Sequence, residues 1–393
     1  MRGSPELFET VTDGPENIPV RPIRETPGAL SVLEDAKRWL DRRSWAAADR
    51  PLPDLLAAKR AAGPAGSISV VLPALNEEAT VGTIVEKLRR ELMDAVPLID
   101  ELMVIDSGST DRTSEVAAAA GAKVVHRDEI LPRLPAVPGK GEVLWRSLLA
   151  ADGEIVCFVD ADLRDFDCRF VSGILGPLLT EPEVQLVKAM YDRPLGENPS
   201  GARQGGRVTE LVARPLLNLH WPQLAGVVQP LGGEYAARRA LLERLPFPVG
   251  YGVELGLLVD TLHVAGLDAV AQVDVGVRRH RNQDGQALGR MAAAILRTAE
   301  RRLPRPGIGR PAGLTQFERT PDGGFAPRTH PIDTSERPPM ISVPEYAARR
   351  GTGVTAGLGG DGDGAGPPGG VIDAMPGQTF DSPRSWQSSA HGR

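Results

Sequence analysis

The run Asp160-Ala161-Asp162 carries the residue types best suited to chemistry in this chain. It follows directly on residues 154–159, an apolar stretch typical of a buried strand. Two carboxylates at the end of such a strand offer hard oxygen ligands to a divalent cation, which can also bind phosphates. Acidic pairs at strand ends also serve as turn residues and helix caps. The motif alone leaves a metal–diphosphate site and a structural turn both open.

The elements that must position this pair form an alternating pattern. Short β-branched runs at 67–72, 102–105 and 123–126 predict strands, and helical periodicity predicts helices at 77–92, 109–120 and 142–151. This alternation predicts an α/β fold with a mostly parallel sheet covered by helices. A polar loop follows the first two strands, at 73–77 and 106–110, as it does the strand before Asp160. Such sheets bind ligands at these C-terminal strand edges.

Three features of these loops suit a nucleotide. Glu77 and Asp106 could accept hydrogen bonds from a base or ribose, and residues 107–108 let the backbone approach closely. The hydroxyls at 109–110 could instead cap the next helix without a ligand. Lys140 lies in Pro138-Gly139-Lys140-Gly141, where glycines would expose N–H groups to a phosphate, although the full P-loop pattern is absent. A surface lysine remains the alternative there.

Composition and charge narrow the class of protein. The net charge of −6 over 393 residues argues against a nucleic-acid or anionic-membrane partner. Only Cys157 and Cys168 are present, and Cys157 falls within a predicted strand, so a disulfide framework is not expected. No apolar run approaches the roughly 18 residues of a membrane span, and no leader pattern opens the sequence. These features predict a cytoplasmic enzyme acting on small molecules.

Strings spread over residues 67–317 together resemble one enzyme family. They are 71–78 (VLPALNEE), 106–111 (DSGSTD), 138–142 (PGKGE), 160–162 (DAD), 205–215 (GGRVTELVARP), 229–235 (QPLGGEY), 251–254 (YGVE) and 280–282 (HRN). The first and third occur widely among sugar transferases, whereas 205–215 and the last two are more specific. The chain resembles the glucosyl-3-phosphoglycerate synthases, retaining glycosyltransferases of the GT-A fold found in actinobacteria. Relatives often carry serine where this chain has Ala161.

This resemblance implies a donor site and a metal site. Asp162 and His280 would hold Mg²⁺ or Mn²⁺ against the diphosphate, since a carboxylate and a neutral imidazole leave most coordination positions open. From its arginine-rich surroundings alone, His280 would be a surface histidine. The implied catalytic residues are Asp162, Glu254 and Lys140. The implied contacts to the nucleotide sugar are Pro73, Ala74, Leu75, Glu77, Ser107, Lys140, Asp160, Tyr251 and Glu254.

The resemblance also implies an acceptor site made by Gly206, Arg207, Thr209 and Asn282. A backbone N–H, a guanidinium and a hydroxyl suit 3-phosphoglycerate, which carries about three negative charges. A helix beginning near residue 208 would add its dipole to the attraction. A solvated basic face made by Arg207 and Arg214 is the alternative.

The implied reaction moves glucose from UDP-glucose, or GDP-glucose, to the 2-hydroxyl of D-3-phosphoglycerate with retention, the first step toward glucosylglycerate and methylglucose lipopolysaccharide. Retention could arise by front-face attack, which we favour, or through a covalent adduct on a carboxylate such as Glu254. A mannosyl-3-phosphoglycerate synthase or a polyprenyl-phosphate sugar transferase would share the nucleotide half. A sugar-phosphate nucleotidyltransferase would want a glycine-rich basic loop where this chain has residues 73–77. The family also implies a homodimer.

The expected organisation has five segments. Residues 1–30 form a flexible segment, and residues 31–65 form a helical extension whose first helix begins with a capping box between Ser31 and Glu34. Residues 66–165 form the nucleotide-sugar half of the catalytic domain, and residues 166–319 form its acceptor and dimerisation half. Residues 320–393, rich in glycine and proline, form a disordered tail.

Overall fold

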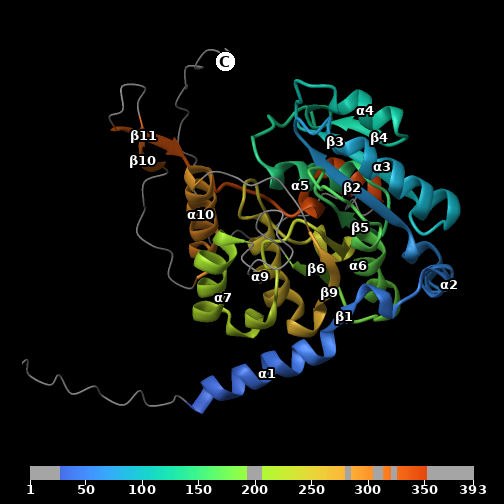
Figure 1. Ribbon diagram of the computed structural model, residues 1–393, viewed down its shortest axis with the longest axis horizontal. Coiled ribbons are helices and arrows are strands. Elements are labelled where there is room, and N and C mark those ends of the chain that lie inside the picture. The colour runs from blue at the N-terminus through green and yellow to red at the C-terminus, as the bar shows by residue number, and fades with distance from the viewer. Residues whose placement is uncertain (1–26, 193–205, 279–284, 304–312, 320–324, 352–393) are drawn as a thin grey trace, which may run out of the picture. The chain divides into compact units, whose positions relative to one another are not determined.

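An eight-stranded sheet runs through the computed structural model, which describes residues 27–192, 206–278, 285–303, 313–319 and 325–351 (Figure 1). Its strand order is β1-β9-β6-β7-β5-β2-β3-β4. All neighbours pair in parallel except β7, which is antiparallel to β5 and β6. The α/β prediction is therefore confirmed. The strands are β1 (Ser44–Ala46), β2 (Ile68–Ala74), β3 (Glu101–Asp106), β4 (Lys123–His126), β5 (Ile155–Phe158), β6 (Leu186–Asp192), β7 (Tyr235–Arg238) and β9 (Val270–Val277).

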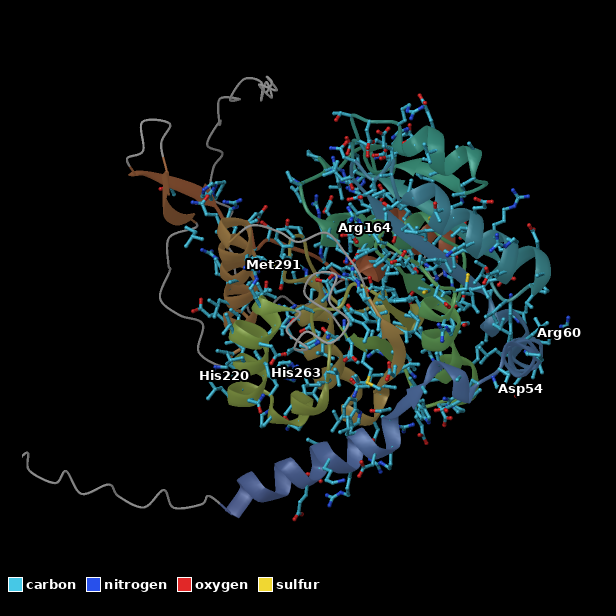
Figure 2. All side chains as sticks on the ribbon, viewed as in Figure 1. Asp54, Arg60, Arg164, His220, His263 and Met291 are labelled. Carbon is cyan, nitrogen blue, oxygen red and sulfur yellow. The ribbon has the colours of Figure 1, made fainter. Side chains whose placement is uncertain are left out.

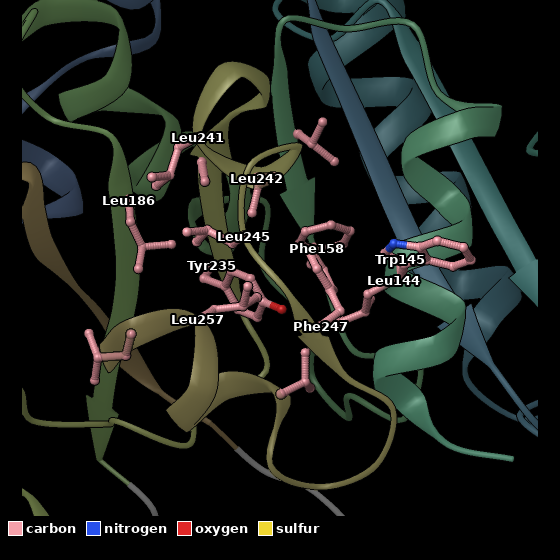
Figure 3. Packing of buried hydrophobic residues seen from close by; sticks show 14 of the residues in the cluster. Leu144, Trp145, Phe158, Leu186, Tyr235, Leu241, Leu242, Leu245, Phe247 and Leu257 are labelled. Atoms are coloured by element: carbon pink, nitrogen blue, oxygen red, sulfur yellow. The ribbon is translucent and has the colours of Figure 1, made fainter. Parts of the chain in front are cut away.

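Helices cover both faces of this sheet. One buried cluster joins side chains of α5 and α9 to Phe158 and Tyr235, as Figure 3 shows for part of it. A second cluster joins α2, α3 and α6 to the opposite face. The helices are α1 (Pro27–Arg43), α2 (Leu52–Ala62), α3 (Val81–Arg89), α4 (Thr113–Ala119), α5 (Lys140–Ala150), α6 (Arg169–Thr180), α7 (Arg214–His220), α8 (Arg239–Leu242), α9 (Val253–Ala265), α10 (Gly285–Glu300) and α11 (Pro344–Arg350).

The N-terminal extension docks on the edge of the sheet. Trp39 of α1 is fully buried and donates its indole N–H to the carbonyl of Val270 at 2.8 Å. Next to it, β1 adds a parallel strand to β9. Helix α1 begins at Pro27, so Ser31 lies inside the helix and the predicted capping box is wrong. The predicted flexible segment lies almost wholly outside the described residues.

The predicted tail is wrong over residues 325–351. Two short strands, β10 (Gly313–Arg319) and β11 (Phe325–Pro331), form a hairpin, and β12 (Glu336–Arg337) pairs with β8 (Phe247–Pro248). Met340 and Tyr346 are buried. The overall composition of this segment is polar and rich in glycine and proline, and it hides a few apolar residues. Burial of these residues is enough to stabilise a short ordered segment. Residues 352–393 lie outside the described part of the chain.

One ion pair ties this C-terminal segment to the start of α5. Glu142 is fully buried and accepts hydrogen bonds from Arg337 Nε at 2.6 Å and from Arg146 Nε at 2.7 Å. Arg337 also donates to the carbonyl of Pro135 at 2.8 Å and lies 5.3 Å from the centre of the Trp145 ring. The segment therefore satisfies a buried charge two residues from Lys140.

We expect Arg337→Met to lower the free energy of unfolding by about 2–4 kcal/mol, because it leaves a buried carboxylate with one cationic partner instead of two. Urea unfolding would measure this change. The matched control is Arg349→Met, at an exposed pair with Asp152, where a loss below about 1 kcal/mol is expected. Equal losses for both variants would show that the Arg337–Glu142 pair contributes no more than a surface pair.

Candidate active site at the C-terminal edge of the sheet

The polar loops after β2, β3 and β5 meet at one edge of the sheet. Ser107 N–H donates to the carbonyl of Ala74 at 2.9 Å, and Thr80 Oγ1 donates to the carbonyl of Ala161 at 2.6 Å. Asn76, with a φ of 58°, accepts the N–H of Thr110 at 2.8 Å. Of the predicted donor residues, Pro73 and Ala74 end β2, whereas Leu75, Glu77 and Ser107 lie in these loops, and the side chain of Leu75 is exposed.

Asp106 has a structural role in the loop after β3, and its predicted contact to the nucleotide stays a prediction. One carboxylate oxygen accepts the N–H groups of Gly108 at 2.9 Å and Ser109 at 2.7 Å, and the other accepts the hydroxyl of Ser114. Burial opposes the charge, but these hydrogen bonds hold the pKa of Asp106 below its usual value. With both oxygens engaged, Asp106 fixes the shape of the loop that presents Ser107.

Lys140 brings two acids together on one side of this edge. Its ammonium lies 2.5 Å from Asp160 Oδ1 and 2.9 Å from Glu254 Oε1. Lys140 is the first residue of α5, and Glu254 lies in the first turn of α9. Burial opposes the ammonium charge, but Asp160 and Glu254 hold the pKa of Lys140 well above its usual value. Tyr251, half exposed, lies in the turn before α9.

Glycines allow the close approach on which this cluster depends. A Cβ on Gly139 would lie 2.2 Å from the carbonyl oxygen of Val249, and one on Gly141 would lie 1.8 Å from that of Pro248. The motif around Lys140 therefore packs the start of α5 against a neighbouring segment, a function the sequence did not indicate. A Cβ on Gly233 would lie 2.3 Å from Asp160 and 2.5 Å from Lys140.

Arg278 binds the Asp160–Asp162 pair from the other side. Its Nη2 lies 2.8 Å from Asp160 Oδ2 and 3.6 Å from Asp162 Oδ1. Asp162 Oδ1 is buried and has no hydrogen-bond partner among the described residues. Burial and the charge of Asp160 raise the pKa of Asp162. A buried carboxylate oxygen without a hydrogen bond fits a cation ligand, so Asp162 suits the predicted metal role.

His280, the other predicted metal ligand, and Asn282, a predicted acceptor contact, lie outside the described residues. Within the described part of the chain, no three histidine, cysteine or acidic side chains gather as a cation site. His263, labelled in Figure 2, lies in the last turn of α9, at the opposite end from Glu254. His263 therefore does not fill the metal-binding role that was predicted for His280.

Three of the four predicted acceptor residues, Gly206, Arg207 and Thr209, lie at the start of one helical stretch. Gly206 has a φ of 89°, and the exposed Arg207 is the first helical residue after it. Thr209 is buried and begins a π-helical turn, Thr209–Ala213, that continues into α7. Arg214 pairs with Glu210 at 2.8 Å, so it has an intrahelical role. The helix predicted near residue 208 is confirmed, while ligand binding there stays a prediction.

A second buried lysine lies on the same sheet face as the Lys140 cluster, and no motif in the sequence indicates it. Lys188 of β6 pairs in register with Tyr235 of β7, which in turn pairs with Phe158 of β5. The Lys188 ammonium lies 4.7 Å from the centre of the Tyr235 ring and donates to the carbonyl of Gly232 at 2.8 Å. Burial lowers the pKa of Lys188 to about 8, against attraction from Glu254. The Tyr235 hydroxyl is buried without a hydrogen-bond partner among the described residues.

We expect this lysine to give the protein a measurable pH dependence. Between about pH 8 and its ordinary pKa of 10.5, Lys188 is neutral in the folded state but charged in the unfolded chain. The folded state then holds fewer protons, so wild-type stability rises through this window. Relative to Lys188→Met, the wild type should gain about 2–3 kcal/mol between about pH 7.5 and pH 10 in urea unfolding. The exposed Lys123→Met is the control, and a pH dependence of Lys188→Met equal to wild type would contradict the expectation.

Comparison with known proteins identifies the family. The family model described as glycosyl transferase family 2 matches residues 69–204. The glucosyl-3-phosphoglycerate synthase of Mycolicibacterium smegmatis is 52% identical over 308 residues, which cover 78% of this chain and 98% of the relative. The chain belongs to the glucosyl-3-phosphoglycerate synthase family.

Solved structures share the same fold. One is glucosyl-3-phosphoglycerate synthase from Mycobacterium tuberculosis in complex with Mn²⁺, UDP-glucose and phosphoglyceric acid, at 49% identity and a TM-score of 0.64, covering 74% of this chain and 94% of that one. Another is mannosyl-3-phosphoglycerate synthase from Rubrobacter xylanophilus, at 40% identity and a TM-score of 0.71, covering 78% and 98%. The fold thus carries family members named for two different sugars. No helix among the described residues has the length and apolar character to cross a bilayer.

Proposed function

We propose that this chain transfers glucose from UDP-glucose to the 2-hydroxyl of D-3-phosphoglycerate, with retention at the anomeric carbon and with Mn²⁺ or Mg²⁺. The observation that carries the proposal is the cluster at the sheet edge. Lys140 lies between Asp160 and Glu254, and beside it Asp162 has a buried oxygen that accepts no hydrogen bond from the described residues. The similar Mycobacterium tuberculosis enzyme, in complex with Mn²⁺, UDP-glucose and phosphoglyceric acid, supports the choice of ligands.

In this proposal the two ends of the donor occupy different parts of the site. Residues 73–77, Ser107, Lys140 and Asp160 bind the nucleotide, and Glu254 and Tyr251 line the space for the sugar. Asp162, with His280, would hold the divalent cation, which supplies positive charge to the diphosphate as it leaves. Gly206, Arg207, Thr209 and Asn282 would bind the acceptor.

The state of Glu254 favours front-face attack over a covalent intermediate. Its Oε1 pairs with Lys140 at 2.9 Å, and the side chain is buried, so the carboxylate is already neutralised by an ammonium. Such a pair orients sugar hydroxyls better than it attacks an anomeric carbon. In front-face attack, a diphosphate oxygen takes the proton of the acceptor hydroxyl. Mass spectrometry of enzyme trapped during turnover tests this, and a glycosyl adduct on Glu254 would overturn it.

The experiment that tests the function is a matrix of donors and acceptors. UDP-glucose, GDP-glucose and GDP-mannose are each combined with D-3-phosphoglycerate, glycerate or buffer, and products are followed by mass spectrometry and proton NMR. We expect a glucosyl-3-phosphoglycerate with an α-linkage, and release of UDP only when 3-phosphoglycerate is present. Preferred use of GDP-mannose would instead support mannosyl transfer, the second candidate raised by the Rubrobacter xylanophilus structure.

The expected homodimer remains a proposal. Leu211 and Leu219, eight positions apart on the helical stretch that continues into α7, each expose 75% of their surface. Large apolar side chains exposed on one helix are typical of an interface between subunits. Light scattering should give twice the mass of one chain, and a monomer at assay concentrations would contradict the proposal.

The expected cytoplasmic location also remains a proposal. Cys157 and Cys168 are both buried and free, which suits a reducing compartment. Fractionation of cells that produce the protein would test this, and recovery outside the cytoplasm would contradict it.

A further inference from the structure

A chain of hydrogen bonds between buried polar side chains runs from the interior of the sheet to the Asp160–Asp162 pair. Tyr191 donates its hydroxyl to Glu234 Oε2 at 3.0 Å, and Glu234 Oε1 accepts Arg278 Nε at 2.9 Å. Arg278 Nη2 then donates to Asp160 Oδ2 at 2.8 Å. Glu234 and Arg278 are 0% and 3% exposed, so these two charged side chains are shielded from water. Buried charges of this kind interact strongly with one another and are costly to leave unpaired.

The position of Glu234 places it on the far side of the sheet from Lys140. Neighbouring residues of an extended segment point to opposite faces. The next residue, Tyr235, begins β7 and packs in the cluster on the Lys188 face, so Glu234 faces the other way, toward Arg278 and toward Tyr191 of the opposite cluster. Asp160 is therefore held from both faces, by Lys140 on Oδ1 and by Arg278 on Oδ2.

Arg278 donates a hydrogen bond to Asp160 but not to Asp162. The same Nη2 that binds Asp160 lies 3.6 Å from Asp162 Oδ1, which is beyond a hydrogen bond but close enough for attraction. Arg278 and a divalent cation would compete for this oxygen, because both are positive and both seek a carboxylate. The guanidinium of Arg278 must therefore be kept from closing on Asp162.

We propose that Glu234 is a positioning residue for the cation site: by binding Nε of Arg278 it fixes the guanidinium, so that Asp162 stays available to the metal. The inference rests on the metal role proposed for Asp162. Glu234 touches neither substrate nor metal and acts through Arg278. Groups outside the metal ligands that orient their surroundings commonly change metal affinity by 10- to 100-fold when substituted, and Arg278 is such a group, held in place by Glu234.

The test is Mn²⁺ affinity, measured by titration calorimetry and by the EPR signal of free Mn²⁺, with UDP present and no acceptor. We expect Glu234→Gln to weaken Mn²⁺ binding about 10- to 100-fold, because a neutral amide holds the Arg278 guanidinium less tightly than a carboxylate and leaves its positive charge free to act on Asp162. UDP binding in EDTA should change less than about threefold. The matched control is Tyr191→Phe, which removes a hydrogen bond from Glu234 but keeps its charge, and it should leave Mn²⁺ affinity within about threefold of wild type.

A double variant keeps the proposal testable if Glu234→Gln alone does not fold. Glu234→Gln combined with Arg278→Gln removes the competing guanidinium together with its restraint, and Mn²⁺ affinity should return to the wild-type level or exceed it. A double variant that binds Mn²⁺ more than about tenfold more weakly than wild type would overturn the proposal. So would a folded Glu234→Gln with wild-type affinity, or an equal loss in Tyr191→Phe. None of these measurements needs glucose transfer, so failure of the proposed reaction would be seen separately.

Discussion

Asp162→Asn should lower kcat at least about 1,000-fold, equivalent to roughly 4 kcal/mol of transition-state stabilisation. The neutral amide oxygen is a poorer ligand for a hard cation, and Asp162 Oδ1 is a buried carboxylate oxygen without a hydrogen-bond partner among the described residues. Initial rates over a Mn²⁺ titration would measure the loss and should show weaker metal dependence as well.

The fold should survive this substitution, because Asp162 Oδ1 accepts no hydrogen bond from the part of the chain that the structure describes. Circular dichroism and thermal unfolding are therefore expected to match wild type. Asp167→Asn provides the control: Asp167 lies five residues further on and pairs with Arg169 near the surface, so its activity should stay within about threefold of wild type. An Asp162→Asn enzyme with full activity at saturating Mn²⁺ would remove Asp162 from the metal site.

Arg207→Ala should reduce kcat/KM for 3-phosphoglycerate about 30- to 1,000-fold, because the loss of a bidentate contact to the phosphate costs on the order of 2–4 kcal/mol. The KM for UDP-glucose should barely change. Arg207→Lys should recover only part of the loss, since an ammonium cannot reproduce the two parallel hydrogen bonds of a guanidinium. Steady-state kinetics with each substrate varied in turn would separate the two effects.

Two comparisons keep this prediction specific to the phosphate. Unphosphorylated glycerate should be a poor acceptor for wild type and variant alike. Arg214→Ala is the matched control, because Arg214 lies on the same helical stretch but pairs with Glu210, and it should change kcat/KM less than about threefold. If wild type used glycerate as well as 3-phosphoglycerate, or if Arg207→Ala mainly raised the KM for UDP-glucose, the phosphate contact would be wrong.

The strands of the nucleotide-sugar half could be predicted well, because each of them is marked by a short stretch of its own sequence. The runs that became β2, β3 and β4 are short, apolar and followed by polar loops, and parallel pairing then requires those loops to meet at one edge. The position of Asp160 and Asp162 at that edge follows from the same rule. The predicted activity followed from the family resemblance, which the 52% identity to the Mycolicibacterium smegmatis enzyme confirms.

What the sequence could not predict depends on contacts between distant residues. Glu234, Lys188 and Arg278 are charged side chains that become buried only because strands far apart in the chain lie side by side. In sequence they look like ordinary surface charges. Residues 325–351 were missed because overall composition conceals a few buried positions, such as Tyr346, that anchor a short segment.

The pair between Arg337 and Glu142 has a consequence for how the enzyme is made. The two residues are separated by 195 positions, so during synthesis the helix that carries Lys140 leaves the ribosome long before its partner. Until Arg337 arrives, Glu142 has only Arg146 to offset its buried charge. A ribosome that stops early, or a protease that cuts before residue 337, therefore yields a chain whose active-site helix is incompletely anchored. The anchoring of this helix therefore depends on synthesis of the chain at least as far as residue 337.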